Sequence, residues 1–192
     1  MYFNIDYSEK DIAVLAWQLK NKNIFIESVV SRCPWGYPKV VLLSPLPQKN
    51  EKKGNKLNFI AISTPLWLTC PFLNDKIHKL EDQGYVKKIE GLIQGETGHL
   101  EEMKKAHVHY AFLRKKSYLQ FIGEQETIEP NCKIMSSGVG GIRTFDTVKC
   151  LHLHYAHFTL YQENSVGRIT SIILGNDTHC REEICRNAIR EE

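Results

Sequence analysis

Residues 23–46, NIFIESVVSRCPWGYPKVVLLSPL, contain two runs of β-branched and other apolar side chains on either side of a turn rich in proline and glycine. The runs predict strands over about 24–31 and 39–44, because β-branched side chains fit the pleated surface of a sheet. The prolines and the glycine of CPWGYP predict a tight connection between them. This stretch therefore favours a fold built on an antiparallel sheet.

The segments on either side predict a helix before this pair of strands and more strands after it. Ser8 with Asp11 three residues later is typical of a helix N-terminus, and apolar residues follow at helical spacing. Residues 47–56 are polar and predict the tip of a hairpin. Residues 57–71 then predict one or two strands, broken near Pro65.

The second half of the chain predicts mostly helices. Residues 71–85 predict a helix with Pro71 in its first turn, and residues 96–121 predict a longer helix. Another helix is expected to begin with Asp146 as its N-cap, and two short helices are expected near the C-terminus. This order predicts an α+β protein with a single domain over residues 1–192, in which a small antiparallel β-meander packs with several α-helices.

The composition is that of an ordinary globular protein. Of the 192 residues, 42% are apolar and 24% are charged, and the net charge is +3. Basic and acidic residues are interleaved, which permits a small anionic ligand but gives no basic stripe of the kind that nucleic-acid-binding proteins use. No signal peptide and no run of ~20 apolar residues is present. We therefore expect a cytoplasmic protein without a membrane segment, whose six cysteines are mostly reduced.

The stretch DTVKCLHLHYAHFTLY, residues 146–161, concentrates histidines around a cysteine. On a helix, Cys150, His154 and His157 fall on one face, whereas His152 points nearly opposite to Cys150. Zinc binds such a mixture of thiolate and imidazole ligands, and iron–sulfur clusters favour thiolates. The alternative is a helix whose histidines only pack or face solvent.

Two further cysteines, Cys33 and Cys70, each precede a proline at an expected chain turn. A cysteine at a strand-to-helix junction, as predicted for Cys70, lies near a helix N-terminus that favours the thiolate. We expect Cys132 and Cys180 to have surface or packing roles, and Cys185 stays open as a further ligand. The alternative for each thiol is simple burial, since free cysteine is commonly buried.

The motif SSGVGGIR predicts a glycine-rich loop before the histidine-rich stretch. Gly138, Gly140 and Gly141 allow sharp turns that can point amides at an anion, with Arg143 and Lys149 close by in the sequence. A plain connecting turn is the alternative, because the motif is not a phosphate-binding P-loop.

On the long predicted helix, His107 and Tyr110 share a face, and histidine is suited to proton transfer near neutral pH. We therefore group His107 and Tyr110 with Lys149 as candidate catalytic residues. No G-x-S-x-G, H-E-x-x-H or G-x-G-x-x-G motif is present, so the sequence does not favour the common hydrolase, zinc-protease or dinucleotide-binding classes.

The blocks RCPWGYP, LTCP, AHVHY and SSGVGGIRTFDTVKCLHLHYAH together resemble a bacterial family, domain of unknown function family 501, in order over about residues 29–167. The matching residues are Arg32, Cys33, Pro34, Gly36, Pro38, Cys70, Pro71, His107, Tyr110, Gly138, Gly140, Gly141, Lys149, Cys150, His152 and His157. The segment from about 176 to 192 is expected to be a helical extension particular to this branch.

The resemblance stresses His152 and His157 together with Cys150, whereas helical spacing pairs Cys150 with His154 and His157. Either the helix begins after Cys150, or His152 serves a different neighbour. Both alternatives stay open at the level of the sequence.

Three hypotheses for function follow. In the first, Cys33, Cys70 and Cys150 bind an iron–sulfur cluster or zinc, with His152, His157 or Cys185 completing the site. The glycine-rich loop with Lys149 would then hold the anionic part of a small ligand, and Arg143 and Arg32 are further candidates for binding that anion. The alternatives are a metal-free enzyme with a cysteine nucleophile and a histidine base, and a small interaction module whose cysteines only pack. The substrate, the oligomeric state and whether the protein is an enzyme stay open.

Overall fold

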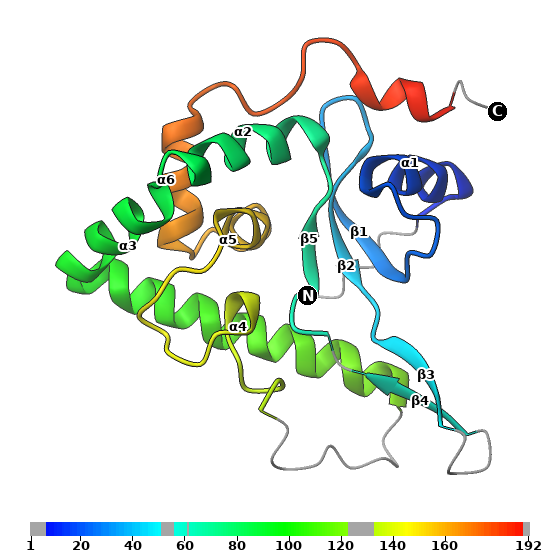
Figure 1. The fold of residues 1–192 in the computed structure, drawn as a ribbon, viewed down its shortest axis with the longest axis horizontal. Coiled ribbons are helices and arrows are strands. Elements are labelled where there is room, and N and C mark those ends of the chain that lie inside the picture. The colour runs from blue at the N-terminus through cyan, green and yellow to red at the C-terminus, as the bar shows by residue number, and fades with distance from the viewer. Residues whose placement is uncertain (1–6, 51–55, 61, 123–132, 190–192) are drawn as a thin grey trace.

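The computed structural model describes residues 7–50, 56–60, 62–122 and 133–189 (Figure 1). The helices are α1 (Glu9–Leu19), α2 (Pro71–Asp82), α3 (Tyr85–Gly95), α4 (Thr97–Ile122), α5 (Leu151–Phe158) and α6 (Ser165–Leu174). The strands are β1 (Ile26–Arg32), β2 (Pro38–Leu43), β3 (Leu46–Asn50), β4 (Lys56–Ile60) and β5 (Leu66–Leu68). Two short 3₁₀ helices are η2 (Val139–Gly141) and η3 (Ile184–Ile189). Cys132 lies outside the described residues.

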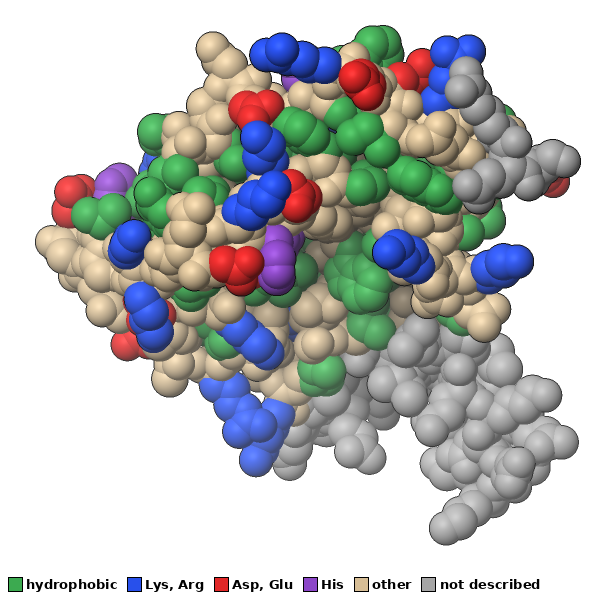
Figure 2. Space-filling view, turned by 45° about the horizontal axis from the view of Figure 1, so that its top comes forward, with side chains coloured by type: hydrophobic (Ala, Val, Ile, Leu, Met, Phe, Trp, Pro, Cys, Tyr) green, Lys and Arg blue, Asp and Glu red, His purple; other side chains and the backbone are tan. Residues whose placement is uncertain are grey.

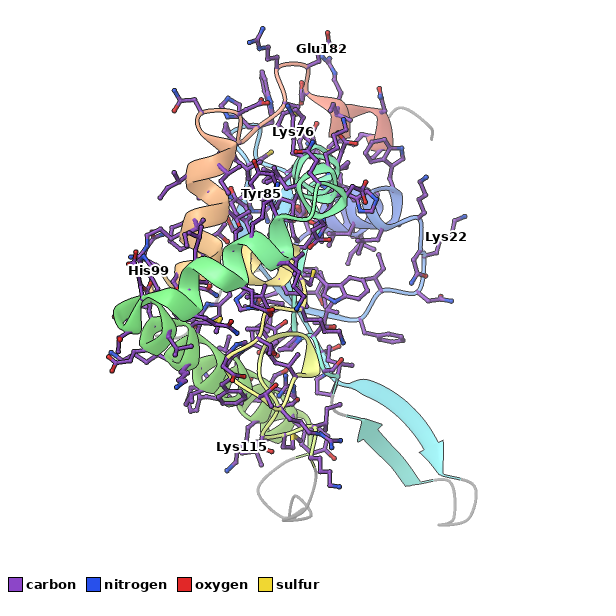
Figure 3. All side chains as sticks on the ribbon, turned by 60° about the vertical axis from the view of Figure 1, so that its left-hand side comes forward. Lys22, Lys76, Tyr85, His99, Lys115 and Glu182 are labelled. Carbon is purple, nitrogen blue, oxygen red and sulfur yellow. The ribbon has the colours of Figure 1, made fainter. Side chains whose placement is uncertain are left out.

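The predicted antiparallel sheet is confirmed. β2 is its central strand and pairs with β1, where Arg32 lies opposite Pro38, and with β5, where Val40 lies opposite Leu68. β3 and β4 form a separate antiparallel pair that projects away from the rest of the molecule (Figures 1 and 3). These two strands extend into the polar segment that was expected to be only a hairpin tip. The α+β class predicted from the sequence is the observed class.

Helices cover both faces of the three-stranded sheet (Figure 1). On one face, Leu15 of α1 packs with Val29 and Val41. On the other face, Val30 and Val40 join a larger core that α2, α3, α4, α5 and α6 share. Successive strand residues point to opposite faces, which explains why neighbouring valines of one strand enter different cores.

The predicted start of α1 is confirmed. Ser8 Oγ accepts a hydrogen bond from the Asp11 amide (3.2 Å), and the Asp11 carboxylate accepts one from the Ser8 amide (2.9 Å). Arg32 donates to both carboxylate oxygens of Asp11, at 2.7 and 3.0 Å, and these bonds lower the pKa of Asp11 to about 2. Arg32 thereby ties the end of β1 to the first turn of α1.

The prediction that a helix starts from Asp146 is wrong, because α5 begins at Leu151 with Cys150 as its N-cap. The backbone just before α5 is hydrogen-bonded to α3. The Val148 amide donates to the Glu90 carboxylate of α3 (2.7 Å), and Cys150 is still extended (φ −155°, ψ 126°), so the helical conformation begins only at Leu151. This finding selects the first of the two alternatives above, in which the helix starts after Cys150.

α3 is not among the predicted elements. Gly84, with a positive φ of 78°, separates α2 from α3 and lets the chain change direction between the two helices. Ile89 and Ile93 lie one turn apart on α3 and are fully buried in the large core. The spacing of these apolar residues is helical, and they form a helix of their own between α2 and α4.

The surface carries charges of both signs. On the face drawn in Figure 2, lysine and arginine side chains are interspersed with aspartate and glutamate. Within the described parts of the chain, none of the helices is both long and apolar enough to cross a membrane.

Candidate functional site

A thiol, an imidazole and a carboxylate meet where α5 begins. Cys150 is the N-cap of α5, His152 lies in the first turn, and Glu81 reaches them from the last turn of α2. One ligand atom from each of the three residues lies within 4.8 Å of the other two. In the described part of the chain this is the only group of three or more such residues within that distance. Glu81 was not among the predicted site residues.

The imidazole of His152 is held from both ends. Its Nε2 donates to the carbonyl oxygen of Asn74 (3.1 Å), and its Nδ1 lies 3.2 Å from Glu81 Oε1 and 3.6 Å from Cys150 Sγ. Burial alone would lower the pKa of His152, but the hydrogen bonds with Cys150 and Glu81 and the charge of Glu81 outweigh it and raise the pKa to about 10. Without a metal ion, His152 is therefore protonated at neutral pH.

The carboxylate of Glu81 has two partners in the same site. It accepts the amide of Leu151, the first residue of α5, at 2.6 Å, and it pairs with the His152 ring. Burial would raise the pKa of Glu81, but the hydrogen bond and charge of His152 hold it below its usual value. Glu81 thus caps α5 in place of the Cys150 side chain, which makes no capping bond.

A second group of polar side chains is buried between α4, α5 and α6. His107, His154 and His157 are each at most 1% exposed. Burial lowers the pKa of all three, to about 4 for His107 and about 3 for His157. These three rings are therefore neutral at physiological pH.

Asn164, the N-cap of α6, fixes the tautomers in this group. Its Oδ1 accepts from the Gly167 amide (3.0 Å) and from His154 Nδ1 (3.2 Å), so its Nδ2 donates to His157 Nδ1 (3.2 Å). His157 Nε2 then donates to Nδ1 of the half-buried His109 (2.9 Å). Both ring nitrogens of His157 are thus used in a chain of hydrogen bonds that runs from the core towards the surface.

His107 lies against the glycine-rich loop. Its Nδ1 accepts the Val139 amide (3.0 Å), and a Cβ on Gly138 would come within 2.6 Å of the same nitrogen. Gly140 and Gly141 have φ values of 69° and 81°, which favour glycine. Glycines are therefore required here by the close approach to His107 and by the turn.

Three amides of this loop, those of Gly138, Val139 and Gly141, are hydrogen-bonded within the protein. The Gly138 amide donates to Ile142 and the Gly141 amide to Gly138. Lys149 Nζ donates to the Gly140 carbonyl (2.9 Å), and Arg143 is exposed near the loop. Of the predicted anion-binding groups, the structure thus brings Lys149 to the loop itself, whereas Arg32 lies with Asp11 at α1.

Tyr110 is fully buried one turn after His107 on α4. Its hydroxyl donates to the Leu66 carbonyl (3.4 Å), and burial raises its pKa. One turn further, Arg114 is also buried and donates to five carbonyl oxygens, those of Ile62, Ser63, Ile134, Ser137 and Gly138. The helical spacing of 107, 110 and 113 or 114 indicates that one of Leu113 and Arg114 shares the buried face of α4, and both are buried.

The structure separates the three cysteines that were expected to share one centre. Cys33 and Cys70 lie at one end of the three-stranded sheet, whereas Cys150 lies with Glu81 and His152. The sulfurs of Cys33, Cys70 and Cys150 do not all lie within 4.8 Å of one another. Cys33, Cys70, Cys150, Cys180 and Cys185 are all free thiols.

Fold and site together define an α+β protein with a carboxylate, thiol and imidazole group at the start of a helix. The family described as "Protein of unknown function (DUF501)" matches residues 29–171. The chain belongs to this family. No curated protein and no solved structure matches the chain. The matched region includes Glu81, Cys150 and His152.

Proposed function

We propose that Glu81, Cys150 and His152 bind a single zinc ion and leave one coordination position open. The observation that carries the proposal is the convergence of the three donor atoms within 4.8 Å. Zinc accepts sulfur, nitrogen and oxygen ligands in tetrahedral geometry, and catalytic zinc sites keep three protein ligands. One thiolate is too few for an iron–sulfur cluster, which cysteine thiolates hold.

The second support is the orientation of His152. Histidines that bind metals usually donate their other ring nitrogen to a carbonyl or carboxylate, which fixes the ring and the tautomer. The bond from Nε2 to the Asn74 carbonyl is of this kind and leaves Nδ1 as the ligand atom. The ion would displace the proton that Nδ1 otherwise shares with Glu81 and Cys150, so zinc affinity should rise with pH.

A zinc ion with an open position acts as a Lewis acid and can lower the pKa of a bound water to about 7. We therefore infer a hydrolytic or related reaction on a small anionic substrate. Lys149, which directly precedes Cys150, and the exposed Arg143 supply positive charge for that substrate. The free thiols fit a reducing compartment, so we place the protein in the cytoplasm.

Zinc binding by the metal-free protein, measured by equilibrium dialysis, tests this proposal. Replacing Cys150→Ser or His152→Ala should remove one equivalent of zinc or weaken its binding at least about 100-fold, since even residues behind the ligands cost 10 to 100-fold. Glu81→Gln is the sharper variant, because its amide oxygen can still accept the Leu151 amide while the charge is lost. His78→Ala is the matched control, because His78 lies on the exposed face of α2, the helix that carries Glu81. Full zinc retention in all three site variants would contradict the proposal.

A second candidate is a metal-free thiol enzyme with Cys150 as nucleophile. Cys150 at the N-cap of α5, with its sulfur 3.6 Å from His152 Nδ1, occupies a position typical of reactive cysteines. Alkylation by iodoacetamide separates the two functions. Zinc should protect Cys150 and a chelator should expose it, whereas the thiol enzyme predicts fast alkylation that zinc does not change.

A further inference from the structure

Four cysteines gather at the end of the sheet where β1 and β5 finish and β2 begins. Cys33 directly follows β1, and Cys70 follows β5 by two residues. Arg32 lies opposite Pro38 and Val40 opposite Leu68, so the two cysteines flank the start of β2. Two strand spacings separate them, which is about 10 Å between their Cα atoms.

The backbone around Cys70 is attached to β2 directly. The amides of Thr69 and Cys70 donate to the Lys39 carbonyl, at 2.9 and 3.4 Å, and Thr69 Oγ1 donates to the Pro38 carbonyl (3.3 Å). The position of Cys70 at this edge is therefore fixed by three hydrogen bonds to the first two residues of the central strand.

The C-terminal segment brings Cys180 and Cys185 to the same edge. Trp35, in the turn after Cys33, donates its ring N–H to the Cys180 carbonyl (3.0 Å). A single atom, Nε2 of Gln18, contacts both the Pro38 carbonyl (2.9 Å) and Cys185 Sγ (3.2 Å). In Figure 1 this segment returns past the end of the sheet to lie beside α1.

The turn and the C-terminal segment also share a small core. Cys185 is buried there with Val14 and Tyr37, and Cys33 packs against the same cluster. The Tyr37 hydroxyl donates to Glu183 (2.7 Å), midway between the two C-terminal cysteines. Trp35 and Tyr37, which both follow Cys33, thus hold the C-terminal segment in place.

The four thiols lie close enough to influence one another. Burial raises the pKa of Cys185 to about 11, and the neighbouring Cys70, Cys33 and Cys180 raise it further. Burial likewise raises the pKa of Cys70, and Cys33 and Cys180 add to the effect, while the Leu73 and Phe72 amides at the start of α2 oppose it. These helix amides favour negative charge on the sulfur, as amides around cluster-binding thiolates do.

The spacing of the sulfurs distinguishes between a single ion and a larger group. A zinc ion bound at 2.3 Å by four thiolates holds their sulfurs roughly 4 Å apart. Within the described residues, no three of these four sulfurs lie within 4.8 Å of one another. Four cysteines that are neighbours at a wider spacing suit the larger inorganic core of an iron–sulfur cluster.

We propose that Cys33, Cys70, Cys180 and Cys185 bind one [4Fe–4S] cluster, at a site separate from the Glu81, Cys150 and His152 group. Two ferrous ions, two ferric ions and four sulfide ions supply the core during assembly without any change of oxidation state, and each of the four thiols releases its proton to solvent as its sulfur bonds to iron. Cys33 and Cys70 lie within the residues that match the family, whereas Cys180 and Cys185 lie beyond them. The C-terminal segment of this chain therefore supplies two of the four proposed ligands.

Anaerobic reconstitution of the full chain with equal amounts of ferrous and ferric iron and with sulfide tests the proposal. About four iron and four sulfide should bind per chain, with the broad visible absorption of iron–sulfur charge transfer. Cys180→Ser and Cys185→Ser should each lose most of this absorption. Cys150→Ser, a cysteine outside the site, should retain it in full, and this control distinguishes failure of the cluster site from failure of the zinc site.

Circular dichroism of the iron-free variants separates loss of the cluster from loss of the fold, and Cys180→Ala provides a second variant that adds no hydroxyl to the core. Iron that survives in a Cys180→Ser, Cys185→Ser double variant would overturn the proposal. So would a wild-type chain that takes up no iron, or one that holds zinc at these four cysteines in place of iron.

Discussion

Arg114 organises segments of backbone that are far apart in the sequence. It extends from α4 and donates to carbonyl oxygens in two chain segments, around Ser63 and around Ser137. The guanidinium group suits this role, because its donors are arranged in a rigid planar fork. The glycine-rich loop beside His107 is therefore fixed by a side chain that the sequence analysis did not single out.

Removing Arg114 should destabilise the protein strongly. Arg114→Met keeps most of the side-chain length but leaves buried carbonyls without a donor, each costing about 1–3 kcal/mol. We expect the free energy of unfolding, measured by urea titration, to fall by at least about 3 kcal/mol. Arg143→Met, on the exposed side of the same loop, should change it by less than about 0.5 kcal/mol. Equal stability of the two variants would show that the carbonyl bonds of Arg114 contribute little.

At the scale of elements, α5 and α6 pack closely against each other, and a glycine makes this possible. A Cβ on Gly167 would lie 2.4 Å from Phe158 Cβ and 2.5 Å from the His154 carbonyl oxygen. Backbone cannot move aside as a flexible side chain can. The position of α6 therefore depends on Gly167, and with it the position of Asn164, which orients His154 and His157.

Gly167→Ala should separate the two helices and lower the free energy of unfolding by about 1–3 kcal/mol, the usual cost of overpacking. Gly91→Ala is the matched control, because Gly91 lies within α3 and a Cβ there would meet nothing within 4 Å. That change should stabilise the protein by up to about 1 kcal/mol. Thermal unfolding of both variants tests the contrast, and a stabilising Gly167→Ala would refute it.

Local turn chemistry explains which elements the sequence could predict. The strands on either side of CPWGYP and the capped start of α1 depend on residues that are close in the sequence, and both predictions are confirmed. The start of α5 depends on distant residues, since Glu90 binds the Val148 amide and Glu81 binds the Leu151 amide. The local sequence pattern does not indicate bonds between residues so far apart, so α5 was predicted to start too early.

The same reason limits what the sequence says about the candidate site. Cys150 and His152 stand out because cysteine and histidine are uncommon and close together. Glu81 lies 70 positions before Leu151, to which it bonds, and looks like any acidic residue of an amphipathic helix. The fold alone brings the third member of the group to the other two.

For the whole molecule, the histidines make stability depend on pH. His107, His154 and His157 have lowered pKa values in the folded state, so below about pH 6.5 the unfolded chain binds more protons than the folded protein does. The pKa of His152 is instead raised, to about 10. His152 therefore contributes fully to the stability of the fold below about pH 6.5, and this contribution is lost as the pH rises towards 10. Stability should therefore be highest near neutral pH.

Urea unfolding of the metal-free protein at several pH values tests this expectation. Between pH 6.5 and 5 the free energy of unfolding should fall, with a slope that approaches about 1.4 kcal/mol per pH unit for each buried histidine. Asp11 does not contribute in this window, because its stabilising effect is lost only below about pH 4. A free energy of unfolding that stays constant from pH 7 to 5 would mean that the pKa values of the three histidines are the same in the folded and unfolded states.

α2 connects the two proposed centres. Cys70 is its N-cap and Glu81 lies in its last turn, so the helix sets a separation of about 16 Å along its axis. A rigid helix that moves along this axis displaces both groups together. If filling one centre shifts α2, the affinity of the other centre changes, and linkage requires the reverse effect to be equal in size. The protein would then report the supply of one metal through its affinity for another.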